Sequence, residues 1–403
     1  MTINPTYRIS YSNREQLKNI QQQIEIFQND FHKNTAQLEK ISANMHNMQK
    51  NMDTFFLEDR MNKSKLDNPL KYFYDDLCFS PFMSIDILPD GNVYPCCAYN
   101  TNNYSFGNIY NESFEKIWYS DKARLFRQSI LDKDYKFCNL NVCMKLKGSA
   151  SFFCSLFNND GLLKYPYEVE FAHDRTCNLQ CITCRDKAYA SCKDEIEKMN
   201  SLINTHFIPI LKDAGIVITN GAGELFASEH IKKLIYSITR NFPNIKFDLY
   251  TNGYLCNLVN LSALGLIDKI RQIHISLHAA KKETYKKIVH GGDFDIVMDN
   301  INLMCSLKHQ NKIQKLQLCF VISALNFREM KDFLHMCIKL DADAVFWEYR
   351  KWGTLLDEQY DDLSIWTIQH PLHNEFLDLL KDPIFDSKFC IMNDMLKSLR
   401  LSS

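Results

Sequence analysis

Short apolar runs alternate with amphipathic stretches through the second half of this chain. Six runs, each short enough for one strand, lie near residues 167–172, 215–219, 246–250, 272–277, 316–322 and 344–348. Between them apolar residues recur at helical spacing, for instance over residues 228–240 and 326–340. Strands that alternate with helices in this way pair in parallel through right-handed crossovers. The pattern therefore predicts an α/β fold with a parallel sheet over residues 165–350.

The first sixty residues carry a different period. Apolar residues stand three and four positions apart from Leu17 to Phe55, and Asn34 is the polar exception in this stripe. This a/d spacing is typical of a coiled coil, and a single polar residue in the seam usually sets register and strand number. We expect a helical coiled-coil arm over residues 10–60. The arm would form a homodimer, dock another protein, or fold back onto its own domain.

A third pattern separates these two regions. Residues 82–88 alternate like a strand, Pro89 to Asn92 form a strong turn signal, and residues 93–96 return as a second strand. Further along, Ser113 is a suitable N-cap for a short helix. The sequence predicts a small cysteine-rich α+β domain over residues 75–160. Residues 351–403 are expected to form a helical tail that closes the core.

Composition narrows the class of protein. The 403 residues hold 47 Lys and Arg against 48 Asp and Glu, so no nucleic-acid footprint is expected. The amino-terminal residues do not read as a signal peptide, and no run of about eighteen apolar residues indicates a membrane span. We therefore expect a cytoplasmic protein. In a reducing cytoplasm, its 15 cysteines indicate metal ligands or buried thiols.

Three of these cysteines stand together directly after the first predicted core strand. Cys177, Cys181 and Cys184 form a C-x3-C-x2-C pattern within eight residues. A structural zinc site normally takes four protein ligands. Three close thiolates suit a [4Fe-4S] cluster that leaves one iron open to a small molecule.

This spacing resembles the radical S-adenosylmethionine (SAM) superfamily. The resemblance implies a partial (β/α)6 TIM-type barrel in which Cys177, Cys181 and Cys184 hold a [4Fe-4S] cluster and SAM binds its open iron. It also implies reductive cleavage of SAM to methionine and a 5'-deoxyadenosyl radical, which abstracts a hydrogen atom from substrate. In such barrels the site gathers at the carboxyl ends of the strands.

Two polar turns follow the next strands and supply candidate contacts to SAM. The segment Asn220 to Glu224 is similar to the family's Gly-Gly-Glu-Pro, so Gly221 and Gly223 are expected to let the backbone approach SAM. The Glu224 carboxylate could hold the ammonium of SAM. The next turn recurs in the family, and its Asn252 is either a contact or part of a plain turn.

The fourth strand ends in two more candidates. The family commonly places a polar residue here against the ribose or carboxylate of SAM, so Ser276 is expected in that role. His278 lies at the same end of the strand. It could contact the substrate, or it could cap the loop.

The cysteines ahead of the core resemble a SPASM domain, an auxiliary iron–sulfur module of many radical SAM enzymes. The resemblance implies that Cys78, Cys96, Cys138 and Cys143 hold a second, closed [4Fe-4S] cluster. Cys154 is an alternative to Cys143 as the fourth ligand. Four thiolates also suit zinc, which spacing alone does not exclude.

Together these features predict a radical SAM enzyme that acts on a peptide or carbohydrate-type substrate, with the auxiliary cluster relaying electrons. A reductant such as flavodoxin or ferredoxin would supply the electron. The alternative is a non-catalytic iron–sulfur or zinc scaffold that recruits a partner through its coiled coil.

Overall fold

A single ten-stranded sheet organises the part of the chain that the structure describes. The computed structural model describes residues 78–101, 103–139, 143, 163–185, 187–219, 222–350 and 357–402, all in one compact unit. The predicted coiled-coil arm, Gly221 and Cys154 lie outside these residues. The strand order is β12-β11-β10-β8-β7-β6-β4-β1-β2-β3.

The six predicted core strands are present and consecutive in this sheet. They are β4 (Glu168–Phe171), β6 (Ile216–Thr219), β7 (Lys246–Thr251), β8 (Ile270–Ser276), β10 (Lys315–Ile322) and β11 (Asp343–Glu348). Each pairs in parallel with the next, and the one register shift among these pairs falls at Phe247/Asp248. The predicted α/β fold with a large parallel sheet is therefore confirmed.

Two further parallel strands extend this row beyond the prediction. At one edge β12 (Cys390–Met392) pairs with β11, and at the other β1 (Ser84–Ile87) pairs with β4. The strand β2 (Asn92–Tyr94) returns antiparallel to β1, and β3 (Gly107–Asn108) follows it. The hairpin ahead of the core is thus continuous with the main sheet, which the sequence pattern did not predict.

The predicted strand at residues 82–88 is only partly correct. Its first residues belong to a short helix, α3 (Ser80–Met83), and the strand begins at Ser84. Pro81 favours the helical start because it has no N–H to leave unpaired in the first turn. The predicted cap is present, since Ser113 Oγ accepts a hydrogen bond from Lys116 N at 3.4 Å at the start of α4 (Phe114–Trp118).

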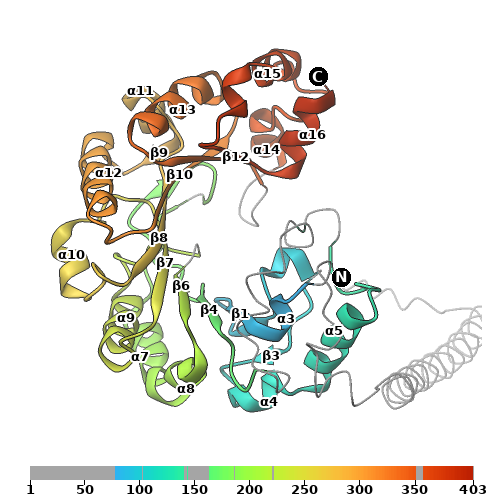
Figure 1. Cartoon of the computed structure of the whole chain (residues 1–403), viewed down its shortest axis with the longest axis vertical. Coiled ribbons are helices and arrows are strands. Elements are labelled where there is room, and N and C mark those ends of the chain that lie inside the picture. The colour runs from blue at the N-terminus through green and yellow to red at the C-terminus, as the bar shows by residue number, and fades with distance from the viewer. Residues whose placement is uncertain are drawn as a thin grey trace, which may run out of the picture. The chain divides into compact units, whose positions relative to one another are not determined.

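Helices connect the core strands, and α9, α10 and α12 lie along one side of the sheet in Figure 1. In α9 (Glu229–Asn241) the apolar face buries Ile231, Leu234, Ile235 and Ile238 against the strands. The other helices of the described residues are α5 (Asp121–Leu131), α7 (Lys193–Ser201), α8 (Ile208–Ile210), α10 (Leu258–Ala263), α11 (Lys282–Ile288), α12 (Phe294–His309), α13 (Met330–Lys339), α14 (Asp357–Leu363), α15 (His373–Leu380) and α16 (Asp394–Ser402). Within the described residues, no helix is both long and apolar enough to cross a membrane.

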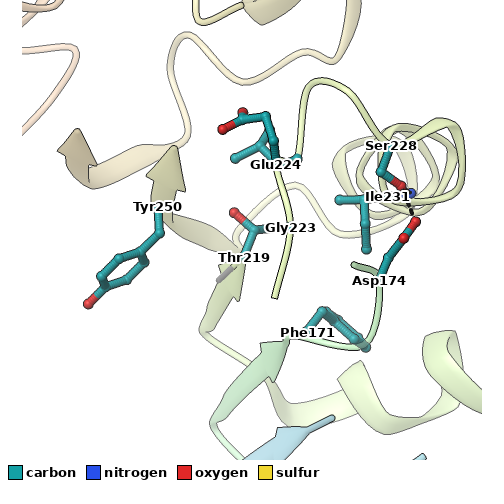
Figure 2. A pocket seen from close by; sticks show the side chains of 9 residues that line it. Phe171, Asp174, Thr219, Gly223, Glu224, Ser228, Ile231 and Tyr250 are labelled. Carbon is teal, nitrogen blue, oxygen red and sulfur yellow. Dashed lines mark hydrogen bonds between the residues drawn. The ribbon is translucent and has the colours of Figure 1, made fainter. Parts of the chain in front are cut away.

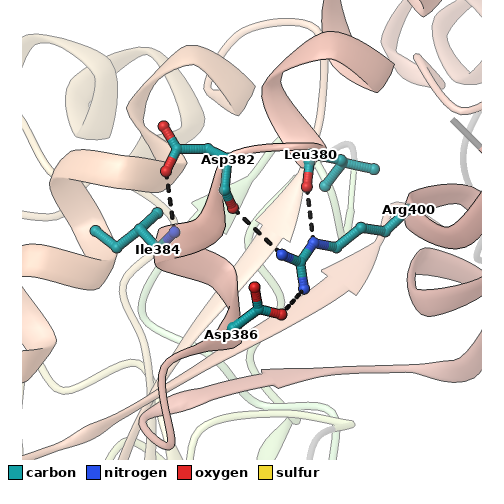
Figure 3. A network of polar contacts seen from close by, with 5 residues as sticks. All are labelled: Leu380, Asp382, Ile384, Asp386 and Arg400. Carbon is teal, nitrogen blue, oxygen red and sulfur yellow. Dashed lines mark hydrogen bonds and ion pairs between the residues drawn. The ribbon is translucent and has the colours of Figure 1, made fainter.

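The carboxyl-terminal helix is held by one arginine. Arg400 Nε donates to Leu380 O at 2.8 Å, and its other nitrogens reach Asp386 Oδ1 at 2.5 Å and Asp382 O at 3.4 Å (Figure 3). Asp382 Oδ1 in turn accepts from Ile384 N at 3.0 Å. These contacts tie α16 to the turn after α15. The strand β12 lies between that turn and α16, so the predicted helical tail also contains a strand.

A buried histidine pair packs behind β4. His173 and His230 are 2% and 0% exposed, and their Nε2 atoms lie 2.7 Å apart. His230 Nδ1 lies 2.9 Å from Asn200 Oδ1, which can only accept, so His230 carries its proton on Nδ1. His173 Nε2 must then donate to His230 Nε2. Burial lowers the pKa of His173 to about 3 and that of His230 to about 4.

This pair makes folding stability depend on pH. Unfolded histidine titrates near pH 6.5, above both folded pKa values, so acid favours the unfolded chain. Between pH 7 and pH 5 the free energy of unfolding should fall by about 2 kcal/mol for each histidine kept neutral. Urea titrations at the two pH values measure the change. Replacing both residues by glutamine should remove about 4 kcal/mol of the difference. The buried His274 and His278, whose pKa values are also lowered, keep their own share. An equal pH dependence in that variant would contradict the assignment.

A buried arginine joins the helices around the amino-terminal hairpin. Arg127 is 1% exposed, and its Nε and Nη1 donate to Pro81 O at 2.8 Å and Trp118 O at 2.6 Å. Its guanidinium carbon lies 4.1 Å from the centroid of the Trp118 ring. Burial lowers the pKa of Arg127 to about 9. The side chain thus links α3, α4 and α5.

Replacing Arg127 by alanine should cost about 3 kcal/mol of unfolding free energy, because two buried carbonyl oxygens lose their donors and the stacking is lost. The matched control is Lys122→Ala on the exposed face of the same helix, which should change stability by less than about 0.5 kcal/mol. Chemical denaturation of the two variants measures the change in their unfolding free energies. Equal midpoints would mean that Arg127 does not hold these helices together.

Candidate functional site

The loop with the three clustered cysteines follows β4 and is held at several points. Its middle forms β5 (Gln180–Cys181), which pairs with β9 (Val289–His290). Cys177 N donates to Tyr189 O at 2.8 Å, and Ile182 N donates to Ile288 O at 3.0 Å. Leu179 is 1% exposed and packs into the core. The loop is therefore fixed at the carboxyl end of β4 as predicted.

The three thiols lie close enough to affect one another. Burial, and after it the neighbouring thiols of Cys184 and Cys177, raise the pKa of Cys181 to about 12. The pKa of Cys177 is also raised, first by burial and then by Glu224 and Cys184. Three adjacent thiolates repel one another, and a bound cationic metal centre that contacts all three sulfurs would offset that repulsion.

Arg185 places a positive charge beside these sulfurs. Its Nη1 donates to Arg175 O at 2.9 Å and its Nη2 to Ala222 O at 2.8 Å. Burial acts to lower the pKa of Arg185, but the charges of the neighbouring thiols and a hydrogen bond with Cys184 raise it overall. Arg185 was not among the site residues predicted from the sequence. Its only signal is its position directly after the third cysteine.

The loop after β6 packs directly against the cysteine loop. A Cβ added to Gly223 would lie 2.3 Å from Thr176 O and 2.7 Å from Asp174 O. Glu224 N donates to the same Thr176 O at 2.7 Å. Gly223 is therefore required for backbone contact between two loops, a close approach that only glycine allows.

The Glu224 carboxylate is buried at 2% exposure and connects the loops after β6 and β7. Its Oε1 accepts from Thr251 Oγ1 at 2.8 Å and from Phe226 N at 3.3 Å, and its Oε2 accepts from Asn252 N at 2.7 Å. Burial raises the pKa of Glu224 to about 7, against these three hydrogen bonds. Every partner is a donor, so the ionised form fits the site. Its predicted contact with the ammonium of SAM stays a prediction.

Asn252 reaches from β7 to the cysteine loop. Its Nδ2 lies 3.9 Å from Cys177 Sγ and 3.0 Å from Asn178 Oδ1. These contacts are with the cysteine loop, and a contact of Asn252 with SAM stays a prediction.

Ser276 and His278, the two candidates at the end of β8, differ in whether their side chains are open to a ligand. Ser276 is half-buried, and within the described residues its hydroxyl makes no hydrogen bond, so it is open to a ligand. His278 is buried, has φ +62°, and its Nδ1 accepts from Val321 N at 3.2 Å. Burial lowers the pKa of His278 to about 4. His278 thus caps the loop.

Asp174 is a further functional candidate that the sequence did not reveal. Its Oδ2 accepts from Ser228 Oγ at 2.5 Å, and its Oδ1 accepts from Thr176 N at 2.8 Å and Ser191 Oγ at 3.1 Å. Figure 2 shows Asp174 beside Ser228 at the start of α9, next to a small cavity that Thr219 and Glu224 also line. Its carboxylate ties the cysteine loop to the helix after β6.

A second group of cysteines gathers around α3. Burial, and after it the thiols of Cys78 and Cys143, raise the pKa of Cys138 to about 12, so these three are close together. Cys96 lies two residues after β2, level with the start of β1, where Ser84 Oγ donates to Pro95 O at 2.9 Å. Cys96 stays a prediction as the fourth ligand.

Both groups fit iron–sulfur clusters by the chemistry of their donors. In each group, neighbouring thiols help to raise the pKa of one cysteine, Cys181 in the first and Cys138 in the second. The first group also has Asn252 and Arg185 directed at its sulfurs. Among the described residues, no three His, Cys, Asp or Glu side chains converge on a single metal ion. The cysteines of a [4Fe-4S] cluster each bind a different iron, so such a cluster does not require that convergence.

Comparison with known proteins agrees with this division. Residues 78–144 match the family model of SPASM, an iron-sulfur cluster-binding domain. Over 179 residues the chain is 29% identical to the GTP 3',8-cyclase of Clostridium acetobutylicum, covering 43% of this chain and 52% of that protein. The enzyme of the same name from Clostridium botulinum is 26% identical over 178 residues, covering 43% and 53%. The chain spans about half the length of the curated relatives it matches.

Solved structures give more distant likenesses. Streptococcus suis SuiB bound to S-adenosylmethionine has a TM-score of 0.38 at 13% identity, covering 79% of this chain and 72% of that one. The protein anSMEcpe, with bound AdoMet and a Kp18Cys peptide, has a TM-score of 0.35 at 18% identity, covering 54% and 60%. TM-scores of this size carry no argument by themselves. The SPASM match and the curated relatives together support a radical SAM enzyme with a SPASM iron–sulfur domain ahead of its core strands.

Proposed function

We propose that this chain is an enzyme that cleaves SAM reductively and abstracts hydrogen from a peptide or carbohydrate-type substrate. The observation that carries the proposal is the set of three mutually interacting thiols on a loop held by the loops after β6 and β7. When bound, a [4Fe-4S] cluster and SAM supply one-electron cleavage of the sulfonium, which yields methionine and a hydrogen-abstracting 5'-deoxyadenosyl radical. The electron comes from a reductant of the flavodoxin or ferredoxin type.

In this proposal the chain's own residues bind the cluster and orient SAM. Cys177, Cys181 and Cys184 hold the cluster. Gly221, Gly223, Glu224, Asn252 and Ser276 form the wall against which SAM lies. The free hydroxyl of Ser276 is suited to a ribose or carboxylate oxygen. Glu224 acts mainly by holding Asn252 and Thr251 in place.

Cys78, Cys96, Cys138 and Cys143 hold the auxiliary cluster in the same proposal. It would relay electrons during the reaction, and four thiolates leave it no open iron. The name GTP 3',8-cyclase describes the activity of the curated relatives. The substrate of this chain stays within the broader class proposed here.

The proposed organisation is a coiled-coil arm at residues 10–60, a SPASM-like domain at 75–160, a radical SAM core of partial (β/α)6 TIM-barrel type at 165–350 and a helical tail at 351–403. The arm would mediate a homodimer or bind a partner protein. We place the protein in the cytoplasm, where a reducing environment keeps 15 cysteines free for metal binding.

Anaerobic reconstitution tests the activity. The full chain, loaded with iron and sulfide and given SAM and dithionite, should release 5'-deoxyadenosine. Cys181→Ala should lower that release at least a hundredfold, because the cluster loses one of its three protein ligands. The matched control is Cys192→Ala, an exposed thiol eight residues after Cys184, which should keep the wild-type rate.

Metal analysis of the same samples separates the alternatives. Iron and sulfide near eight atoms each per chain would fit two [4Fe-4S] clusters (about four of each per cluster). Zinc in place of iron, or clusters without any 5'-deoxyadenosine, would favour the non-catalytic scaffold and overturn the proposal.

Gly223→Ala tests the contact between the two loops. The added methyl group meets backbone oxygens at 2.3 and 2.7 Å, which cannot move as a side chain would. We expect a loss of about 2 kcal/mol in stability and at least twofold less iron at the open cluster.

Gly265→Ala is the control for that substitution. Gly265 has φ +67° and the nearest atom to an added Cβ is 3.4 Å away, so this variant carries backbone strain without a clash. It should lose about 1 kcal/mol of stability and retain its iron. Full iron loading in Gly223→Ala would show that the loop contact is dispensable.

A further inference from the structure

Asn252 occupies a position from which it can act on the cysteine loop directly. It follows the last residue of β7, and its Nδ2 lies 3.9 Å from Cys177 Sγ. That distance is within the range of a hydrogen bond to sulfur. The same nitrogen donates to Asn178 Oδ1 at 3.0 Å, so its two hydrogens have two separate acceptors in the loop.

The orientation of this amide is determined by its other contacts. Asn252 Oδ1 accepts from Tyr254 N at 3.0 Å, and a backbone N–H can only donate. The nitrogen must therefore face Cys177, and a flipped amide would lose the bond to Tyr254. The backbone of Asn252 is held as well, because its N–H donates to the buried Glu224 carboxylate at 2.7 Å. The donor is thus preorganised toward the sulfur.

We propose that Asn252 raises the reduction potential of the open cluster by donating an N–H to the thiolate of Cys177. The inference rests on the proposed function, since it requires a cluster on Cys177, Cys181 and Cys184. A reduced cluster carries one more negative charge than the oxidised one, so a donor to a ligand sulfur stabilises the reduced state more. Asn252 is then a positioning residue that acts through Cys177.

A simpler role would be to hold the cysteine loop in place through Asn178. The first role needs the contact of Asn252 Nδ2 with Cys177 Sγ, and the second needs its hydrogen bond to Asn178 Oδ1. Removing the Asn178 side chain takes away one acceptor and leaves the contact with Cys177. Removing the Asn252 amide takes away both. Comparing the two variants therefore separates an electrostatic effect on the cluster from loop support.

The experiment is an EPR-monitored redox titration of the reconstituted full chain. The signal that changes on addition of SAM identifies the open cluster, because the auxiliary cluster has no free iron. Asn252→Leu should bind as much iron as wild type but show about a tenfold lower ratio of reduced to oxidised cluster at a given potential. For a one-electron couple this equals a drop of about 59 mV. Asn178→Ala should stay near the wild-type potential.

Asn252→Asp provides a second variant if leucine disturbs the turn. Aspartate keeps the shape and the acceptor for Tyr254, loses the donor and adds a negative charge, so it should lower the potential at least as far. An unchanged potential in either loaded Asn252 variant, or an equal drop in Asn178→Ala, would overturn the inference. If wild type shows a reducible cluster whose signal ignores SAM, the proposed function fails, whatever the variants do.

Discussion

The buried carboxylate of Glu224 is the interaction on which the candidate site depends. The backbone N–H of Glu224 donates to Thr176 O in the loop after β4. Its carboxylate accepts hydrogen bonds from Thr251 and Asn252 at the end of β7. Loops after three neighbouring strands are joined at this residue. A carboxylate at 2% exposure is costly unless its oxygens are paired, so the three loops support one another only when all of these bonds form.

This arrangement explains why the site could be predicted in part. The clustered cysteines, Gly223, Glu224 and Asn252 are local signals, each placed directly after a strand, and a parallel sheet brings the carboxyl ends of neighbouring strands to one edge. Their nearness follows from topology alone. What each side chain contacts does not. The structure directs the oxygens of Glu224 to protein donors, which the sequence pattern did not predict, and the contact of its carboxylate with the ammonium of SAM stays a prediction.

Other features of the site and the sheet were not predicted from the sequence, because no local pattern of residues marks them. Asp174 and Arg185 are single charged residues in a loop, and their partners lie 54 and 37 positions away in Ser228 and Ala222. The edge strands β1 and β12 are short, and only their pairing with β4 and β11 shows that they extend the sheet. Alternation predicted the strand at residues 82–88 that contains β1, but not the strand with which it pairs. The strand β12 has three residues, too few for an alternating pattern.

The hairpin at the sheet edge also determines how the two cysteine groups are related. Because β1 runs parallel to β4, α3 and Cys96 lie toward the amino ends of the strands, while the loop with Cys177 follows their carboxyl ends. The four residues of β4 alone span about 13 Å at the usual rise of a strand. In the proposed function, the donors around Cys177, among them Asn252 and Arg185, would therefore act on the open cluster and not on the auxiliary one.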